Sequence, residues 1–154
     1  MIELGGSRLA DEVGRQPDTQ VRHYPHSEVT QQIIGGFYEV YNELGYGFLE
    51  SVYKAALFRD LKQRGLCPAA EAPVPVRFRG EKVGDLCADL VVNQSVVIEL
   101  KAVRVLEPYH EAQLLNYPRS TPIEIGLLMN FGPRPVVRRL AFSNDRKKIS
   151  VNER

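Results

Sequence analysis

The stretch DLVVNQSVVIELK, residues 89–101, contains two apolar segments separated by polar residues 93–95, a pattern typical of a β-hairpin. Side chains alternate between the two faces of a strand, so Glu99 and Lys101 share one face while Leu100 lies on the other. If the loop comprises three residues, Asp89 lies directly across from Glu99, whereas a two-residue loop would offset this pairing by one. The stretch therefore predicts a hairpin that gathers two carboxylates and an amine on one face of a sheet.

Helical and strand patterns continue on both sides of this hairpin. A first helix is expected from Ser27, a suitable N-cap, to Leu44, where Gly45 supplies a stop. A second helix is expected over residues 48–65, and a third over 107–117, ended by Pro118. Strands are expected over residues 74–78, 83–92, 96–102, 125–131 and 136–142. The order predicts an α/β fold, a central mixed β-sheet flanked by α-helices.

Length and composition favour one globular domain. The chain has 154 residues, of which 44% are hydrophobic and 25% charged, values ordinary for a single core. We expect a flexible N-terminal tail over residues 1–26, the domain over 27–143 and a basic C-terminal tail over 144–154.

Several functional classes are disfavoured by what the chain lacks. Twenty Lys and Arg against nineteen Asp and Glu give a net charge of +1, so overall basicity does not indicate nucleic acid. Cys67 and Cys87 have no second ligand at zinc spacing, and the chain has no apolar run suited to a membrane helix or signal peptide. These observations lead us to expect a cytoplasmic protein with no membrane contact.

The face shared by Asp89 and Glu99 is a candidate metal site. Two opposed carboxylates repel each other unless a positive charge lies between them, and hard oxygen ligands suit Mg²⁺ or Mn²⁺. Lys101 offsets only one of the two charges. The alternative is a solvated surface where Lys101 pairs with the acids across strands, worth roughly 0.2–1 kcal/mol. The hairpin alone leaves both interpretations open.

Further motifs add a family resemblance. The segments GFLESVY (residues 47–53), VIELKAV (97–103), EAQLLNY (111–117) and GLLMNFG (126–132) follow one another along the chain. Together with Asp89, they resemble the D…ExK signature of the PD-(D/E)xK nuclease superfamily and, within it, the GxxExxY family. The resemblance spans about residues 28–142 and implies a restriction-endonuclease-like core.

The resemblance also implies roles for individual residues. Asp89, Glu99 and the Leu100 backbone carbonyl would hold Mg²⁺, or alternatively Mn²⁺, with Glu50 as an additional or water-mediated ligand. Lys101 would orient the attacking water or stabilise charge on the phosphoryl group, so the catalytic set is Lys101, Glu99, Asp89 and Glu50. The structural alternative for Glu50 is that it is only an acid in the first turn of a helix, where the helix dipole favours negative charge.

Three further side chains are candidates for substrate binding. Gln113 and Tyr117 match the QxxxY motif of exonuclease-like relatives, and we expect Gln113 in the site and His110 on the surface. Tyr53 is the third, although a partly buried core aromatic is the competing interpretation.

The resulting expectation is a metal-dependent nuclease acting on nucleic acid, with DNA favoured over RNA. The alternative is a non-catalytic nucleic-acid-binding or protein-binding module that keeps the nuclease fold. Pairing of sheet edges into a homo-oligomer also stays open. A phosphate-tracking surface, or else solvated strand edges, could come from Arg77, Arg79, Lys82, Arg104, Arg134, Arg138, Arg139, Arg146, Lys147 and Lys148.

Overall fold

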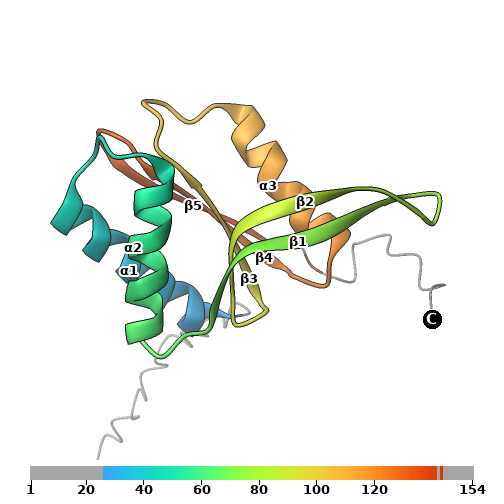
Figure 1. Cartoon of the computed structure of the whole chain (residues 1–154), viewed down its shortest axis with the longest axis horizontal. Coiled ribbons are helices and arrows are strands. Elements are labelled where there is room, and N and C mark those ends of the chain that lie inside the picture. Colours follow the sequence, from blue (N-terminus) through green and yellow to red (C-terminus); the bar gives the residue numbers. More distant parts are fainter. Residues whose placement is uncertain (1–25, 142, 144–154) are drawn as a thin grey trace, which may run out of the picture.

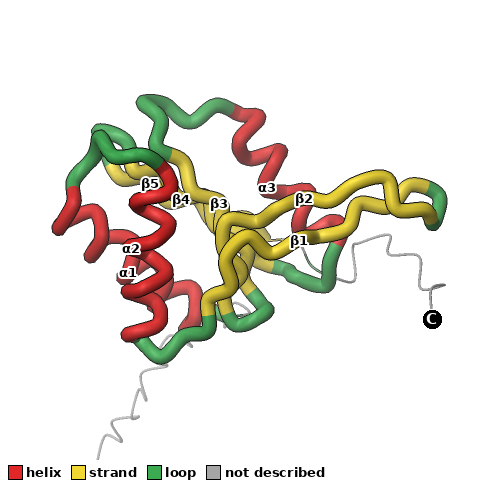
Figure 2. The backbone as a smooth tube through the Cα atoms, in the orientation of Figure 1, coloured by secondary structure: helices red, strands yellow, loops and turns green. Residues whose placement is uncertain are grey.

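A computed structural model describes residues 26–141 and 143 of the chain. The described part contains three helices and five strands, which Figures 1 and 2 show as one sheet with helices on both faces. In chain order they are α1 (Ser27–Leu44), α2 (Glu50–Gln63), β1 (Pro68–Phe78), β2 (Glu81–Val92), β3 (Val96–Lys101), α3 (Pro108–Ser120), β4 (Ile125–Phe131) and β5 (Pro135–Ala141). The expected tails fall outside the described residues except for His26, as do Arg146, Lys147 and Lys148.

The five strands form one sheet in the order β1-β2-β3-β4-β5. Neighbouring strands run antiparallel except β3 and β4, which are parallel. Parallel neighbours need a crossover connection, and α3 provides it. The predicted mixed sheet flanked by helices is therefore confirmed. Within the described residues, no helix is both long and apolar enough to cross a membrane.

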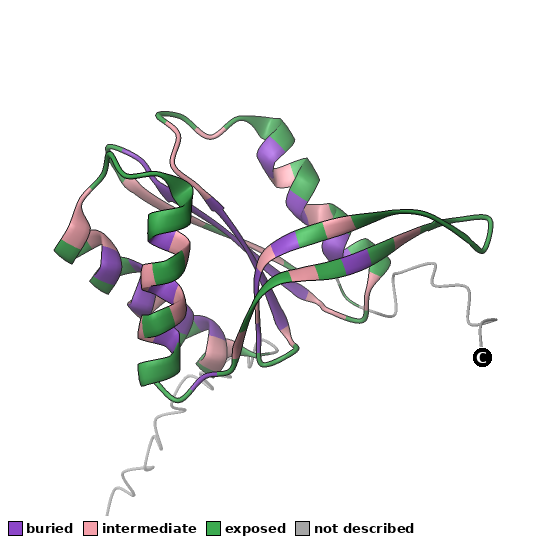
Figure 3. Cartoon of the chain, in the orientation of Figure 1, coloured by how far each residue is buried: buried purple, intermediate pink, exposed green. Residues whose placement is uncertain are grey.

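Two apolar layers cover the two faces of the sheet. Side chains of α1 and α2, such as Phe37 and Leu57, pack with Ile98 and Leu127. On the opposite face Leu114 and Tyr117 of α3 pack with Val97 and Leu128. β4 is buried along its whole length because helices cover both of its faces, as Figure 3 shows. Alternation along β3 thus places Ile98 and Leu100 toward α1 and α2, and Glu99 on the α3 side.

The predicted hairpin and its odd-length loop are confirmed. Val92 pairs with Val96 and Leu90 with Ile98, so residues 93–95 form the loop. The β2–β3 ladder ends at Leu90 and Ile98, whereas β2 continues in its pairing with β1. The same register would put Asp89 opposite Glu99, at the point where the two strands separate. Figure 1 shows the β1–β2 hairpin continuing beyond the rest of the sheet.

Several element boundaries differ from those expected. The first strand begins at Pro68 rather than residue 74, because its first residues pair with the end of β2. Pro73 and Pro75 are tolerated because β1 is an edge strand. One side of an edge strand has no neighbouring strand, so an N–H group missing on that side breaks no hydrogen bond of the sheet. The second helix covers only Glu50–Gln63, and β3 ends at Lys101. The fifth strand is Pro135–Ala141, and the expected end at residue 142 lies outside the described residues.

Both expected helix signals at Ser27 and Pro118 were wrong. His26 occupies the N-cap of α1, and Ser27 is already helical. Pro118 does not end α3, which continues to Ser120. A proline in the last turn removes only one hydrogen bond, and the Thr121 hydroxyl donates to the Tyr117 carbonyl at 2.8 Å. Tyr117 therefore keeps its place on the helix.

The GLLMNFG segment has a structural role at Asn130. This side chain is 2% exposed, and its amide both donates to the Val103 carbonyl (2.9 Å) and accepts from the Val103 N–H (3.0 Å). A Cβ on Gly132 would come within 2.5 Å of the same carbonyl. The pair therefore fixes the segment that leaves β3 immediately after Lys101.

Replacing Asn130 with alanine should lower the free energy of unfolding by about 2–4 kcal/mol, because two buried backbone groups lose their partner. Chemical denaturation of the purified variant measures this change. Asn116→Ala, at an exposed position on α3, is the matched control and should change stability by less than about 0.5 kcal/mol. Equal stability of Asn130→Ala and wild type would contradict the assigned role.

Candidate active site

The Asp89 side chain supplies a hydrogen-bond acceptor for β3 at the point where β2 separates from this strand. Beyond the last β2–β3 pair, the Leu100 N–H has no backbone partner on β2. The Asp89 carboxylate accepts a hydrogen bond from this N–H at 2.8 Å. Because a hydrogen bond to the ionised carboxylate orients it, Asp89 is held beside the end of β3.

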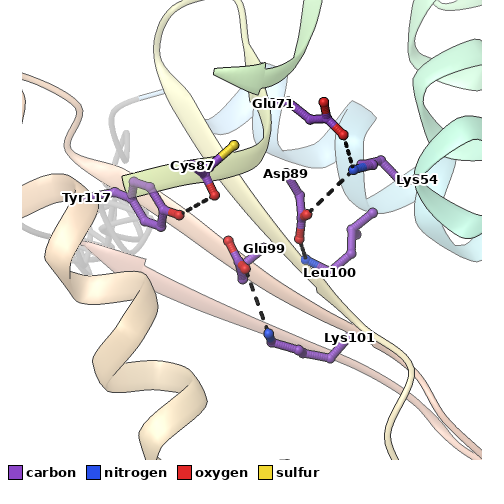
Figure 4. Close-up of polar contacts among 8 residues, drawn as sticks. All are labelled: Lys54, Glu71, Cys87, Asp89, Glu99, Leu100, Lys101 and Tyr117. Atoms are coloured by element: carbon purple, nitrogen blue, oxygen red, sulfur yellow. Dashed lines mark hydrogen bonds and ion pairs between the residues drawn. The ribbon is translucent and has the colours of Figure 1, made fainter. Parts of the chain in front are cut away.

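Glu99 is a buried acid with an unusual environment. The residue is 6% exposed, and its Oε2 atom is buried without a hydrogen-bond partner. Burial, and next to it the neighbouring charge of Asp89, raise the pKa of Glu99 to about 7, while Lys101 opposes the shift. The Lys101 Nζ lies 3.8 Å from Glu99 Oε1, as Figure 4 shows. The predicted group of Asp89, Glu99 and Lys101 is thus brought together.

Glu50 approaches this group from α2. It is the first residue of the helix and is exposed, and its negative charge also contributes to the raised pKa of Glu99. The GFLESVY segment therefore brings a third carboxylate toward the pair formed by Asp89 and Glu99.

Lys54 and Glu71 belong to the same cluster, although the sequence motifs did not identify them. Lys54 Nζ lies 3.1 Å from Glu71 Oε1 and 4.0 Å from Asp89 Oδ1. The hydrogen bond with Glu71 raises the pKa of Lys54. Lys54 lies four residues after Glu50, on the same helix face, which was an available signal. Glu71 has a left-handed backbone (φ 51°) and belongs to the β1 position opposite Asp89, which no pattern in the sequence indicates.

Tyr117 borders the carboxylates from α3. Tyr117 is only 2% exposed and does not offer the expected contact to substrate, because its hydroxyl donates to the Cys87 carbonyl at 2.7 Å and ties the helix to β2 (Figure 4). Burial raises the pKa of the Tyr117 phenol, and the charges of Glu99 and Asp89 add to this rise. Gln113 is exposed one turn earlier on α3.

Two further expectations for single residues need correction. His110 is 3% exposed rather than on the surface, because its Nδ1 accepts the Glu107 N–H at 2.9 Å and caps α3. Tyr53 is completely buried, donates its hydroxyl to the Gly45 carbonyl at 2.7 Å and stacks on Phe131. Its ring therefore supports the α1–α2 connection and does not reach a substrate.

The chemistry of this cluster fits a divalent cation. Within residues 26–141 and 143, no three Asp, Glu, His or Cys side chains already stand at metal-binding positions. However, Asp89 and Glu99 are close enough for their side chains to interact, and one buried Glu99 oxygen has no donor. Two such carboxylates favour a shared proton or a shared cation. The donors match those of a hard metal ion.

The chain is similar to a known protein family over nearly all of its described residues. The model of a family described as the PD-(D/E)XK nuclease superfamily matches residues 27–140, which include every described helix and strand except the last residue of β5. The crystal structure of SSO0001 is similar, with a TM-score of 0.47 and 21% identity. This similarity covers 77% of the present chain but only 60% of that chain, so the present chain spans less than two thirds of its length. No curated protein matches significantly.

Proposed function

We propose a function from the premise that this chain belongs to the PD-(D/E)XK nuclease superfamily. Its mixed sheet with flanking helices has the restriction-endonuclease-like α/β arrangement. We infer that the chain is a metal-dependent nuclease that hydrolyses phosphodiester bonds, with DNA as the favoured substrate and Mg²⁺ as the favoured ion.

One observation carries this proposal: the partnerless, buried oxygen of Glu99 beside Asp89. Ionising a buried acid with a raised pKa costs free energy. A positively charged ligand beside the carboxylate would offset this cost. A purely structural acid at this position would be expected to have both oxygens hydrogen-bonded.

The residues available to hold the metal are Asp89, Glu99, the Leu100 carbonyl and Glu50. When bound, a divalent cation polarises the phosphodiester and lowers the pKa of a coordinated water. The Leu100 N–H orients Asp89, and burial between the strands keeps bulk water from Glu99.

We assign to Lys101 the role of acting on the reacting phosphate. Its amine lies beside Glu99, and its side chain remains 16% exposed, so it can reach both the acids and solvent. In the proposed reaction Lys101 orients the attacking water and stabilises negative charge on the phosphoryl oxygens. Gln113 contributes an exposed amide for substrate, and Tyr117 closes the α3 side of the site.

We also propose that the chain belongs to the GxxExxY family. Supporting this, GFLESVY brings Glu50 toward the carboxylates, and Asn130 and Gly132 of GLLMNFG support the segment after Lys101. The free thiols of Cys67 and Cys87 suit the cytoplasm that we propose as its compartment.

The test is cleavage of labelled single-stranded and double-stranded DNA and RNA with Mg²⁺, Mn²⁺ or EDTA. Wild-type protein should cleave at least one DNA substrate only when metal is present. Asp89→Asn should weaken metal binding, measured by calorimetry, and reduce cleavage by about 100-fold or more. Asp85→Asn, on the same strand but paired with Lys82 at 2.9 Å, is the matched control and should retain activity. Metal-independent cleavage, or unchanged activity of Asp89→Asn, would exclude this mechanism.

A further inference from the structure

Two hollows lie where β3 and the α1–α2 connection end. One, of about 410 Å³, is lined by residues 46–49, 102–104 and 131–133. The other, of about 380 Å³, is lined by residues 104–106, 130, 133–134, 136 and 138. Arg104 and Pro133 line both, so the two hollows meet at these residues. Figure 1 shows the α1–α2 connection near the β4–β5 turn, and the hydroxyl of Tyr41, in the last turn of α1, donates to the Gly132 carbonyl at 2.9 Å.

We propose that this surface binds an unpaired DNA strand and leads it to the carboxylates. We call it the strand-binding surface and define it by Tyr46, Phe48, Leu49, Arg104 and Arg134. The inference deepens the proposed nuclease function and rests on it.

Exposed rings supply the first component of the strand-binding surface. Tyr46 is 62% exposed and Phe48 48% exposed, although burial of an aromatic ring is usually favourable. Phe48 is nevertheless held in place: its N–H donates to the Tyr53 hydroxyl at 3.3 Å, and its ring meets the edge of the Tyr53 ring. Gly45 and Gly47 have positive φ angles of 67° and 113°, which lets the short connection turn and present both rings outward.

Arginines supply the second component. Arg104 and Arg134 are exposed, and neither forms an ion pair or hydrogen bond with another described residue. Arg138, which lines the same hollow, is instead paired with Glu111 of α3. Two guanidinium groups available beside two exposed rings match a ligand that offers phosphates and aromatic bases in alternation.

The position of the strand-binding surface links it to cleavage. Leu49 directly precedes Glu50, and Ala102 directly follows Lys101. The surface therefore includes the chain neighbours of an acid and of the amine, and we place the carboxylates at its end.

The same chemistry selects an unpaired strand over a duplex. In a duplex the bases are already stacked on each other, and their flat faces are unavailable to Tyr46 and Phe48. An unpaired strand exposes these faces, and stacking on aromatic side chains tolerates any base. A DNA strand supplies every group that these contacts use, since none of them involves a 2′-hydroxyl.

Fluorescence anisotropy of a labelled oligothymidylate of about 16 nucleotides tests the proposal with the full chain in EDTA, where cleavage is absent. Tyr46→Ala and Phe48→Ala should each weaken binding by about tenfold. Arg104→Ala with Arg134→Ala should weaken binding and reduce the slope of log K against log salt by about 1.4, the value for two lost phosphate contacts on a single strand. A duplex of the same length should bind more weakly.

The β1–β2 hairpin offers a matched control, because Phe78 is 61% exposed and Arg79 lies 5.0 Å from its ring. Phe78→Ala should leave binding unchanged. Equal loss in this control, unchanged binding in the Tyr46 and Phe48 variants, or preference for a duplex or for oligouridylate would each overturn the proposal. Absence of metal-dependent cleavage with this binding pattern intact would instead refute the nuclease function alone.

Discussion

Lys101→Ala is expected to reduce metal-dependent cleavage by about 100- to 1,000-fold while leaving metal affinity nearly unchanged. The reason is geometric, because the Lys101 amine lies 3.8 Å from Glu99 and contributes no oxygen ligand. Its removal takes away a positive charge that stabilises the transition state but leaves Asp89, Glu99 and Glu50 in place. Metal affinity should even rise slightly, since one competing cation has been removed.

Single-turnover cleavage and calorimetric titration with Mn²⁺ measure these two properties on the same preparation. Lys62→Ala serves as the matched control, because Lys62 is an exposed lysine in the last turn of α2. This control should keep wild-type cleavage. Full activity in Lys101→Ala would remove lysine from the mechanism, and loss of metal binding would show that Lys101 acts mainly on the ligands.

Glu99→Gln is expected to stabilise the metal-free protein at alkaline pH and to abolish cleavage. The pKa of Glu99 is raised from an ordinary value of 4.5 to about 7, chiefly by burial. Between these two pH values the folded protein keeps a proton that the unfolded chain has released. The free energy of unfolding therefore falls as pH rises from 4.5 to 7, and the neutral amide of the Glu99→Gln variant would avoid this loss. Above pH 7 the gain should be on the order of 3 kcal/mol at most.

Thermal unfolding in EDTA from about pH 4 to about pH 9 checks this expectation, with Glu43→Gln at an exposed position of α1 as the control. The two curves for wild type and Glu99→Gln should meet below pH 4.5 and separate above it. Added Mg²⁺ should raise the midpoint of the wild type but not that of the variant. A variant less stable than wild type at about pH 8 would show that ionised Glu99 is stabilising and that no cation is needed.

Much of the fold could be predicted because its periodicities are local. The apolar alternation of residues 89–101 predicted the hairpin, and β4 was found at the expected residues 125–131. Boundaries were less predictable where distant segments compete with local signals. β1 gains six residues at its start from pairing with β2, and α3 continues through Pro118 because one lost hydrogen bond in a last turn is tolerated.

The candidate site was predictable only where its residues share a strand or motif. Alternation placed Glu99 and Lys101 on one face, a three-residue loop would put Asp89 opposite Glu99, and the resemblance added Glu50. Lys54 and Glu71 were missed because they meet Asp89 only through the packing of α2 and the pairing of β1. The environments of Tyr53 and His110 were predicted wrongly. The spacing of residues in the sequence does not show whether a hydroxyl or imidazole group is buried or exposed.

By itself the sequence determined the order of elements, the presence of the central hairpin and the identity of the candidate acids and the lysine. These properties depend on side-chain alternation and turn length, which act over a few residues. Only the tertiary structure decided that β2 separates from β3 at Asp89, that Glu99 is buried with an unsatisfied oxygen, and that Tyr46 and Phe48 line one hollow with Arg104. Those properties depend on which segments, distant in the sequence, pack together and exclude water. The spacing of residues within one segment does not indicate this packing.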